Sequence, residues 1–357
     1  MRLSDITGPR LLHIALIYAG ALSLGAIADS INLPLPWMIG AMVFSSAVRL
    51  ADYPVNVPGV TRPMGQVIVS SAVGITFTAE ALATMVDLAI PMVAAALLTV
   101  VAGFIVAAAL MRMARVDVVT ASLASIPMGP VESATLAERH GVAPGPVVLA
   151  QTFRIMVLVL LIPPILVALD GNISDPTEAL RNTPWTPSGA ALMLVLAVVG
   201  AFAGRKVGIA NPFFVGPLGA AAIGTVAGLP VTAYPYPMLV GAQVFLGVWL
   251  GAVLDRALIR RAGSFVPGAV VASFMIMVLC VALGLGLTAV TGQPWQVMVL
   301  ATAPGSVTEM ALTAKVLQEG IAVVTAFHLV RIFIILPSAP LIIGTTAKLA
   351  DRFGLRR

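Results

Sequence analysis

The chain contains the same constellation of proline, glutamate and arginine twice, 177 positions apart. The two sets are, in order, Pro127, Glu132, Arg154 and Pro304, Glu309, Arg331. The flanking segments 125–136 (SIPMGPVESATL) and 302–313 (TAPGSVTEMALT) align at the same offset, so the chain carries a tandem duplication. Each copy includes a carboxylate and a guanidinium in strongly apolar surroundings. Such groups are costly there and indicate a functional site.

The composition indicates that lipid is the solvent for much of this chain. Hydrophobic residues make up 59% of the sequence and charged residues 10%, whereas a soluble domain carries about 25% charged residues. The apolar runs are about 17 to 25 residues long and do not alternate in polarity, which is the length of a membrane-spanning helix. We therefore expect an all-α membrane protein that crosses the cell (inner) membrane several times.

The distribution of charge and of metal-binding side chains narrows the possible functions. The net charge is +5, but the basic residues lie singly or in short groups between apolar runs, which sets orientation and does not form a nucleic-acid-binding patch. Cys280 is the single cysteine and there are three histidines, so the sequence offers no disulfide and no protein-built copper or iron centre. We expect no enzymatic activity, no cofactor, no metal site and no nucleic-acid partner.

Each copy contains six apolar segments. They are 11–29, 34–50, 63–85, 90–112, 117–140 and 143–168 in the first copy, and 187–204, 212–228, 237–256, 265–290, 295–319 and 321–345 in the second. We therefore divide the chain into a first repeat (1–168), a polar, acidic linker (169–186) and a second repeat (187–357). Residues 26–28 resemble a signal-peptide cleavage site, but the first segment has a counterpart in the second copy. We expect it to be retained as a membrane span.

The fifth segment of each copy contains helix-breaking residues at its centre. A proline inside a helix removes a hydrogen bond and clashes with the preceding turn. The sequence therefore predicts two half-helices of about 11 residues each. The breaking residues are Pro127, Gly129 and Pro130 in the first copy, and Pro304 and Gly305 in the second. A re-entrant hairpin and a broken crossing helix both remain open. Either is tolerated at membrane depth only where it is buried in protein or lines a cavity.

Basic residues help to choose between topologies. If the fifth segments re-enter, each copy crosses five times, and fifteen of the twenty basic residues fall in cytoplasmic loops, with only Arg181 clearly outside. If all six segments cross, the balance inside against outside falls to 11 against 5. The positive-inside rule therefore favours two inverted repeats of five crossings, each with a broken or re-entrant helix, and both termini in the cytoplasm.

The buried charges of the repeated constellation have three interpretations. Glu132 with Arg154, and Glu309 with Arg331, could form internal ion pairs that hold the broken segment to the sixth span. The arginines could instead bind an anionic substrate, because a guanidinium matches a carboxylate or phosphate with two parallel hydrogen bonds. The glutamates could also take up H⁺ or Na⁺ as a coupling ion. A pair that opens when substrate arrives would combine the first two roles.

Further polar residues are weaker candidates for ligand contact. Gln66 and Gln243 are matched amides in apolar spans, where hydrogen bonding between helices is the competing role. Ser306 and Thr308 flank the second break and could cap a half-helix. His328 lies one turn before Arg331, and its competing roles are proton transfer and polar packing.

These features resemble those of a known family. The stretches Pro36 to Ala41 (PWMIGA) and Pro212 to Pro217 (PFFVGP), together with the paired motifs above, are similar to the AbrB-type duplicated membrane protein family. Its members are labelled AbrB family transporter or ammonia monooxygenase. The family is similar to antiporter and anion-transporter folds built from five-plus-five inverted repeats, which implies an elevator or rocking mechanism.

The expected function is secondary transport of a small anionic organic solute by alternating access. Inverted repeats with interrupted helices are a recurrent plan of secondary transporters. The alternative is a membrane sensor with an indirect role in regulation of gene expression. The expected partners are the lipid bilayer and a small solute, and the sequence is compatible with H⁺ or Na⁺ coupling and with a homo-oligomer.

Overall fold

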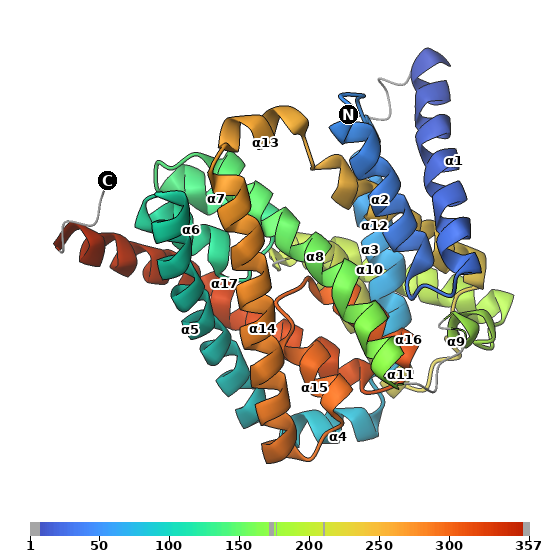
Figure 1. The fold of residues 1–357 in the computed structure, drawn as a ribbon. Helices are drawn as coiled ribbons and strands as arrows, with labels where there is room; N and C mark the ends of the chain where they lie inside the picture. The colour runs from blue at the N-terminus through green and yellow to red at the C-terminus, as the bar shows by residue number, and fades with distance from the viewer. Residues whose placement is uncertain (1–7, 171–174, 176, 210, 353–357) are drawn as a thin grey trace. The chain divides into compact units, whose positions relative to one another are not determined.

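The computed structural model describes residues 8–170, 175, 177–209 and 211–352, and in these ranges all of the regular structure is helical (Figure 1). The helices are α1 (Gly8–Ser30), α2 (Pro36–Leu50), α3 (Thr61–Gly74), α4 (Ala79–Asp87), α5 (Ala89–Ala114), α6 (Val118–Ser125), α7 (Pro130–Arg139), α8 (Pro144–Asp170), α9 (Glu178–Arg181), α10 (Pro187–Val207), α11 (Pro212–Val226), α12 (Tyr236–Ala252), α13 (Arg256–Ala262), α14 (Phe265–Thr291), α15 (Trp295–Thr302), α16 (Val307–Leu317) and α17 (Ile321–Arg352). The two termini, which we expect in the cytoplasm, lie outside the described residues.

The lengths of the helices fit a multi-pass membrane protein. Six helices of the described chain are long and apolar enough to cross a bilayer, and the number rises to eight if each of two bent helix pairs is one span. The six are α1, α5, α8, α10, α14 and α17. The expectation of an all-α membrane protein is therefore confirmed.

The expected segment 63–85 is bent, and the expected segment 237–256 is followed by a further short helix where we expected a loop. α3 and α4 meet at 90°, and α12 and α13 meet at 43°. In each case a polar side chain starts a new helix, because Thr78 Oγ1 accepts a hydrogen bond from the backbone of Ala81, and Asp255 Oδ1 accepts one from Ala257. A side-chain acceptor at a helix start satisfies a backbone N–H that has no partner within the helix.

The chain folds into two compact units that do not coincide with the two sequence copies. Unit 1 comprises Met1–Val86, Pro163–Val253 and Ala311–Ala322, and unit 2 comprises Asp87–Ile162, Leu254–Met310 and Val323–Arg357. Each unit therefore takes segments from both copies. α8, α16 and α17 each begin in one unit and continue in the other.

Helix packing inside unit 1 pairs the first copy with the second. α2 packs on α12 and α3 packs on α11, while α1 and α10 cover α2 and α11. In the second copy α11 corresponds to α2, and α12 corresponds to α3. Exchanging the two copies therefore turns the α2–α12 contact into the α11–α3 contact, so the packing pattern is symmetric. The close approach of α12 to α2 needs small residues, because a Cβ at Gly247 would lie 2.3 Å from the carbonyl oxygen of Met38.

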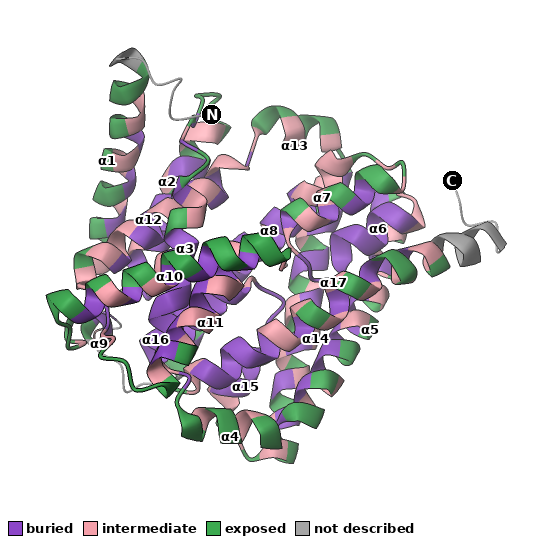
Figure 2. Ribbon diagram, turned by 180° about the vertical axis from the view of Figure 1, so that it is seen from behind, coloured by how far each residue is buried: buried purple, intermediate pink, exposed green. Residues whose placement is uncertain are grey.

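Unit 2 is built around the pair α5 and α14. α6 packs on α5, and α15 packs on α14, which again is the same contact made once by each copy. Apolar side chains such as Val106, Leu110, Phe265 and Ile276 form the core between them. Figure 2 shows α6 and α15 mostly buried, whereas α4 and the outer face of α1 are exposed.

Apolar side chains also cover much of the exposed surface. Leu16 on α1, Ile105 on α5 and Phe202 on α10 are more than half exposed. Exposed apolar surface on this scale is unusual for a soluble monomer and marks a region that contacts lipid or protein. Together with the six span-length helices, it indicates that the bilayer is the partner of these faces.

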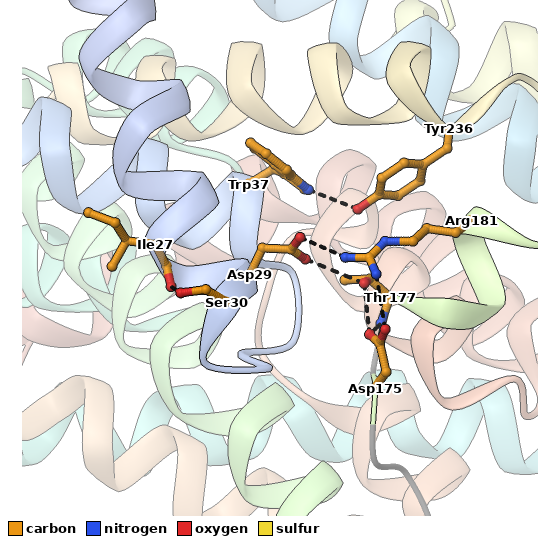
Figure 3. A network of polar contacts seen from close by, with 8 residues as sticks. All are labelled: Ile27, Asp29, Ser30, Trp37, Asp175, Thr177, Arg181 and Tyr236. Atoms are coloured by element: carbon orange, nitrogen blue, oxygen red, sulfur yellow. Dashed lines mark hydrogen bonds and ion pairs between the residues drawn. The ribbon is translucent and has the colours of Figure 1, made fainter.

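The described part of the linker is fixed to the end of α1 by an ionic network (Figure 3). Arg181 on α9 donates to Asp29 at 2.6 Å and to Asp175 at 3.1 Å. The hydroxyl of Thr177 also donates to Asp175, at 2.8 Å. Slight burial of Asp175 favours its neutral acid, but the hydrogen bonds from Thr177 and the charge of Arg181 together hold the pKa of this carboxyl below its ordinary value. The connection between the copies is thus docked on the end of α1 through Arg181 and two carboxylates.

We predict that Gly247→Ala destabilises the protein, because the new Cβ would force α12 away from the α2 backbone. Overpacking of this kind costs about 1–3 kcal/mol. The measurement is the thermal unfolding midpoint in detergent. Gly241→Ala on the same helix is the matched control, because a Cβ there has no atom within 4 Å. Equal midpoints for the two variants would contradict the close packing of α2 and α12.

Candidate functional site

Each fifth segment is broken at the position of its prolines and glycines. In the first copy α6 ends at Ser125 and α7 starts at Pro130, so residues 126–129 are the break. In the second copy α15 ends at Thr302 and α16 starts at Val307, so residues 303–306 are the break. Extended backbone at Ile126 and at Ala303 ends the first half-helix of each copy. Pro130 then occupies the first helical turn of α7, where its missing N–H costs nothing.

A broken helix leaves carbonyl oxygens without partners at the end of its first half, and a donor must be supplied where water is excluded. Arg331 of α17 supplies it in the second copy. Its Nη1 donates to the carbonyl of Ala303 at 2.7 Å, and its Nη2 donates to that of Gly305 at 2.6 Å. One guanidinium therefore bridges two carbonyls of the break.

Arg154 of α8 repeats this contact in the first copy with looser geometry. Its Nη2 donates to the carbonyl of Met128 at 3.0 Å, and its Nη1 lies 3.5 Å from that of Ile126. The sequence separations, 28 and 26 residues, are the same as in the second copy. The duplication seen in the sequence therefore extends to individual hydrogen bonds.

A second side chain supports each bridge one turn earlier. Gln151 Nε2 donates to the carbonyl of Leu123 at 2.5 Å, and His328 Nε2 lies 2.9 Å from that of Leu300. The Nδ1 of His328 is 2.8 Å from Nη2 of Arg331. A guanidinium can only donate, so Nδ1 accepts and the proton of the neutral ring is on Nε2, facing the carbonyl. Of the two roles expected for His328, these contacts fit polar packing.

The glutamates lie at the start of the second half-helices. Glu132 is in the first turn of α7 and Glu309 in the first turn of α16, where a carboxylate is favoured by the positive end of the helix dipole. The carboxylate of Glu132 lies over the Cα of Gly129, where any Cβ would collide with it. This close approach explains a glycine directly before α7.

In the described part of the chain, neither guanidinium contacts a carboxylate. The hydrogen bonds of Arg154 and Arg331 go to break carbonyls and, for Arg331, also to His328. The expected ion pair of Glu132 with Arg154 is therefore replaced by an arginine–carbonyl bridge, and Arg331 also donates to break carbonyls. The physical reason is that an unpaired buried carbonyl costs free energy, and the breaks create such carbonyls beside the arginines.

Several buried polar atoms around the breaks have no hydrogen-bond partner among the described residues. They include Ser125 Oγ, Glu132 Oε2, Gln151 Oε1, Arg154 Nε and Thr308 Oγ1. Arg154 is 3% exposed and Thr308 1% exposed, so bulk water does not serve these groups. Ser306 Oγ accepts a 3.4 Å hydrogen bond from the backbone of Thr308 at the start of α16 and thus occupies the expected cap. Orphaned buried donors and acceptors mark a place where water or a ligand could bind.

The matched glutamines belong to unit 1, whereas the breaks belong to unit 2. Gln66 on α3 and Gln243 on α12 are both buried, on helices that pack together where Gly65 meets the backbone of Ala242. Neither polar atom of the Gln243 amide has a partner in the described chain. The structure thus does not provide Gln243 with the interhelical hydrogen bond that we expected as its competing role.

Sequence reasoning missed one buried charge, Lys315 near the end of α16. Its side chain is 8% exposed, and Nζ donates to the carbonyl of Ala72 at 2.9 Å. The sequence signal was a difference between the copies, because the position equivalent to Lys315 in the first copy is the acidic residue Glu138. In the structure Glu138 is exposed. In the described residues no three His, Cys, Asp or Glu side chains gather closely enough to hold a metal ion.

Comparison with known proteins identifies the family of this chain. The family model described as "Transition state regulatory protein AbrB" matches residues 37–346, which is most of the chain. The chain belongs to the AbrB family. Within this family it is 24% identical over 325 residues to the "Putative regulator AbrB" of Escherichia coli (strain K12), with 90% of this chain and 92% of the relative covered. It is 25% identical over 348 residues to "Uncharacterized protein YhjN" of Bacillus subtilis (strain 168), with 88% of each covered.

We predict that Arg331→Ala destabilises the AbrB family protein more than Arg154→Ala. The first removes two short hydrogen bonds and a histidine contact, whereas the second removes one good bond and one at 3.5 Å. Each buried carbonyl left without a donor costs about 1–3 kcal/mol. Thermal unfolding of the purified variants measures the difference. Arg139→Ala, an exposed position on α7, is the control and should unfold like wild type. If Arg154→Ala lowered the unfolding midpoint more than Arg331→Ala, the bridging interpretation would be wrong.

Proposed function

We propose that this protein is a secondary transporter that moves a small anionic organic solute across the membrane by alternating access. The observation that carries the proposal is a buried positive site at two interrupted helices. Arg154 and Arg331 are both more than 90% buried in unit 2, and neither is neutralised by a carboxylate contact in the described chain. In Arg154 the Nε–H also has no partner. A buried guanidinium with a free donor is suited to bind a carboxylate or a phosphonate.

The bridges at the breaks can serve both structure and transport. A guanidinium carries five N–H donors, so Arg154 can bridge the break with its terminal nitrogens and still present Nε–H to a solute. Each break is followed by the start of a half-helix, α7 or α16, and half-helix starts expose N–H groups that also favour anions. Glu132 and Glu309 occupy these starts, so an incoming anion competes with them. This arrangement favours a site that changes its contacts when solute binds.

We further propose that the two copies are inverted relative to each other in the membrane, with both termini in the cytoplasm. The exchange-symmetric helix contacts and the recurrence of the arginine bridges at equal spacing support a two-fold relation between the copies. The distribution of basic residues supports an axis in the membrane plane. Pseudo-symmetric halves can exchange roles, which brings inward-open and outward-open states close in energy.

The competing proposal is a membrane sensor that affects gene expression indirectly. The names of the family model and of the Escherichia coli relative contain the word regulator or regulatory, and this favours it. A sensor would bind the same class of anion at the same site but would not accumulate it. Solute flux therefore separates the two functions.

We predict that the protein reconstituted in liposomes takes up at least one radiolabelled solute from a panel of small carboxylates, phosphonates and amino acids. Arg154→Ala should reduce the initial rate at least tenfold, because it removes the buried donor. It is the preferred variant because its bridge is the looser of the two, so it should still fold. Arg139→Ala is the matched control and should transport like wild type.

The outcomes of this uptake assay are distinguishable. Wild-type protein that binds members of the panel without taking them up would favour the sensor. Wild-type uptake that Arg154→Ala leaves unchanged, in protein shown to be folded by its unfolding midpoint, would reject the arginine as a substrate-binding residue. An enzyme would instead alter the solute chemically, which chromatography of the recovered label would reveal.

We predict that single cysteines at positions 115 and 260 react only from the cytoplasm. Arg115 and Arg260 are both exposed, at the end of α5 and on α13, one in each copy. Cys280 is fully buried and would be replaced by serine in the background. A cysteine at position 87, the exposed end of α4, should react only from the opposite side. Labelling of positions 115 and 260 from opposite sides with a membrane-impermeant maleimide would contradict the inverted arrangement.

A further inference from the structure

The buried ammonium of Lys315 is the charged group that the anion site does not use. It lies in the last turn of α16, in the part of that helix that belongs to unit 1. Its acceptor, the carbonyl of Ala72, is in the last turn of α3, directly before the 90° bend into α4. A cation at this point faces the negative end of the α3 dipole and supplies a donor to a carbonyl at the helix end.

The surroundings of Lys315 provide few partners that stabilise its positive charge. Among the described residues Nζ makes one hydrogen bond, to Ala72, although an ammonium has three donors. No ion pair with a carboxylate is formed there within the described chain. Burying a charged group with so few partners is costly, and a lysine can escape the cost by losing its proton. A structural cap alone would be served equally well by a neutral donor.

The helices that pack closest to the end of α3 carry few ionisable groups that could bind a proton in place of Lys315. The end of α3 is covered by α11, since a Cβ at Gly74 would lie 2.6 Å from the carbonyl of Leu218, and by Tyr234, whose hydroxyl is 2.9 Å from Ser71 Oγ. α11 and α12 contain no acidic or basic residue. The remaining acidic and basic groups on α16 and on the helices packed on or joined to α3 are Arg49, Arg62, Glu80, Asp87, Arg205, Lys206, Glu309 and, just past α16, Glu319.

The two copies differ at this position. Lys315 is buried, whereas Glu138 at the equivalent place in the first copy is exposed at the end of α7. α7 lies wholly in unit 2, while α16 begins in unit 2 at Val307 and ends in unit 1. Lys315 therefore makes a polar contact that ties the unit 1 part of α16 to α3, and it follows the buried Glu309 by six residues along the same helix.

We propose that Lys315 is a proton-binding site that couples protonation to the attachment of α16 to α3. In the protonated state the ammonium donates a charge-assisted hydrogen bond to the Ala72 carbonyl and holds the end of α16 in place. When Nζ gives one proton to water, the remaining amine forms only a weaker neutral bond, and the end of α16 is released. The further step, that this proton is the coupling ion for the solute, rests on the proposed transport function.

Hydrogen–deuterium exchange tests the attachment without any solute. The protection of the segment 311–322 is measured in lipid nanodiscs from about pH 6 to about pH 11, a range that includes the ordinary lysine pKa of about 10.4. It is expressed relative to the α12 segment 239–252, so that the intrinsic pH dependence of exchange cancels. In the wild type we expect protection to fall by roughly tenfold at the alkaline end, as the local opening becomes easier.

Two variants separate proton binding from simple packing. Lys315→Arg keeps the charge at all of these pH values, so its protection should stay high and constant. Lys315→Met should lack the extra protection throughout, and if it fails to fold the arginine variant still decides. Constant protection in the wild type, or a parallel fall in wild type and Lys315→Arg, would overturn the proposal.

The coupling step has its own measurement. Uptake of the fastest member of the solute panel is compared with and without an imposed pH gradient. We expect the gradient to stimulate the wild type and not Lys315→Arg, while solute exchange at equal pH persists in both. If the wild type takes up none of the panel, the transport function fails and the exchange result still stands. If stimulation is equal in both proteins, Lys315 is not the coupling site although transport holds.

Discussion

Each helix break exposes backbone carbonyls inside an apolar protein unit, and an arginine from the following long helix bridges them. This bridge is the constraint on which the rest of the site depends, because an interrupted helix is tolerated at such depth only when its freed backbone groups find partners. Arg331 meets the carbonyls of Ala303 and Gly305, and Arg154 meets those of Ile126 and Met128. The arginines therefore make the breaks possible and also bring positive charge to them.

The positions of the positive and negative side chains follow from the dipoles of the half-helices. The arginines face the negative ends of α6 and α15, and the glutamates lie at the positive starts of α7 and α16. The helix ends and the break carbonyls thus contribute to the stabilisation of these charges. Such contacts are compatible with the proposed exchange of one partner for a solute.

The charges of the site can also be assigned to the two compact units and to the helices that pass between them. Each unit combines corresponding segments of both copies, so a break from one copy and a break from the other lie in the same unit. α8, α16 and α17 pass from one unit to the other, and these helices carry Arg154, Glu309, Lys315 and Arg331. Of the ionisable residues of the site, Glu132 is the exception, because it lies on α7, which is wholly in unit 2.

Much of the fold was predictable from local sequence. The apolar runs marked the long helices, and Pro127, Gly129 and Pro130 marked the first break because proline and glycine act on the backbone of their own segment. The bends after α3 and α12 were not predicted, because their signals are single capping side chains, Thr78 and Asp255, within apolar stretches. The composition of the two units was also missed, since sequence copies describe ancestry and compact units describe packing.

For the site, the sequence by itself determined which residues matter: a repeated glutamate and arginine in apolar surroundings must be satisfied internally. Only the tertiary structure decided their partners. It gave Arg154 and Arg331 to carbonyl oxygens 26 and 28 residues away, and it gave Lys315 to the end of a helix 243 residues earlier. A hydrogen bond forms with whichever acceptor the fold brings within about 3 Å, and that distance is a property of helix packing that no local sequence pattern encodes.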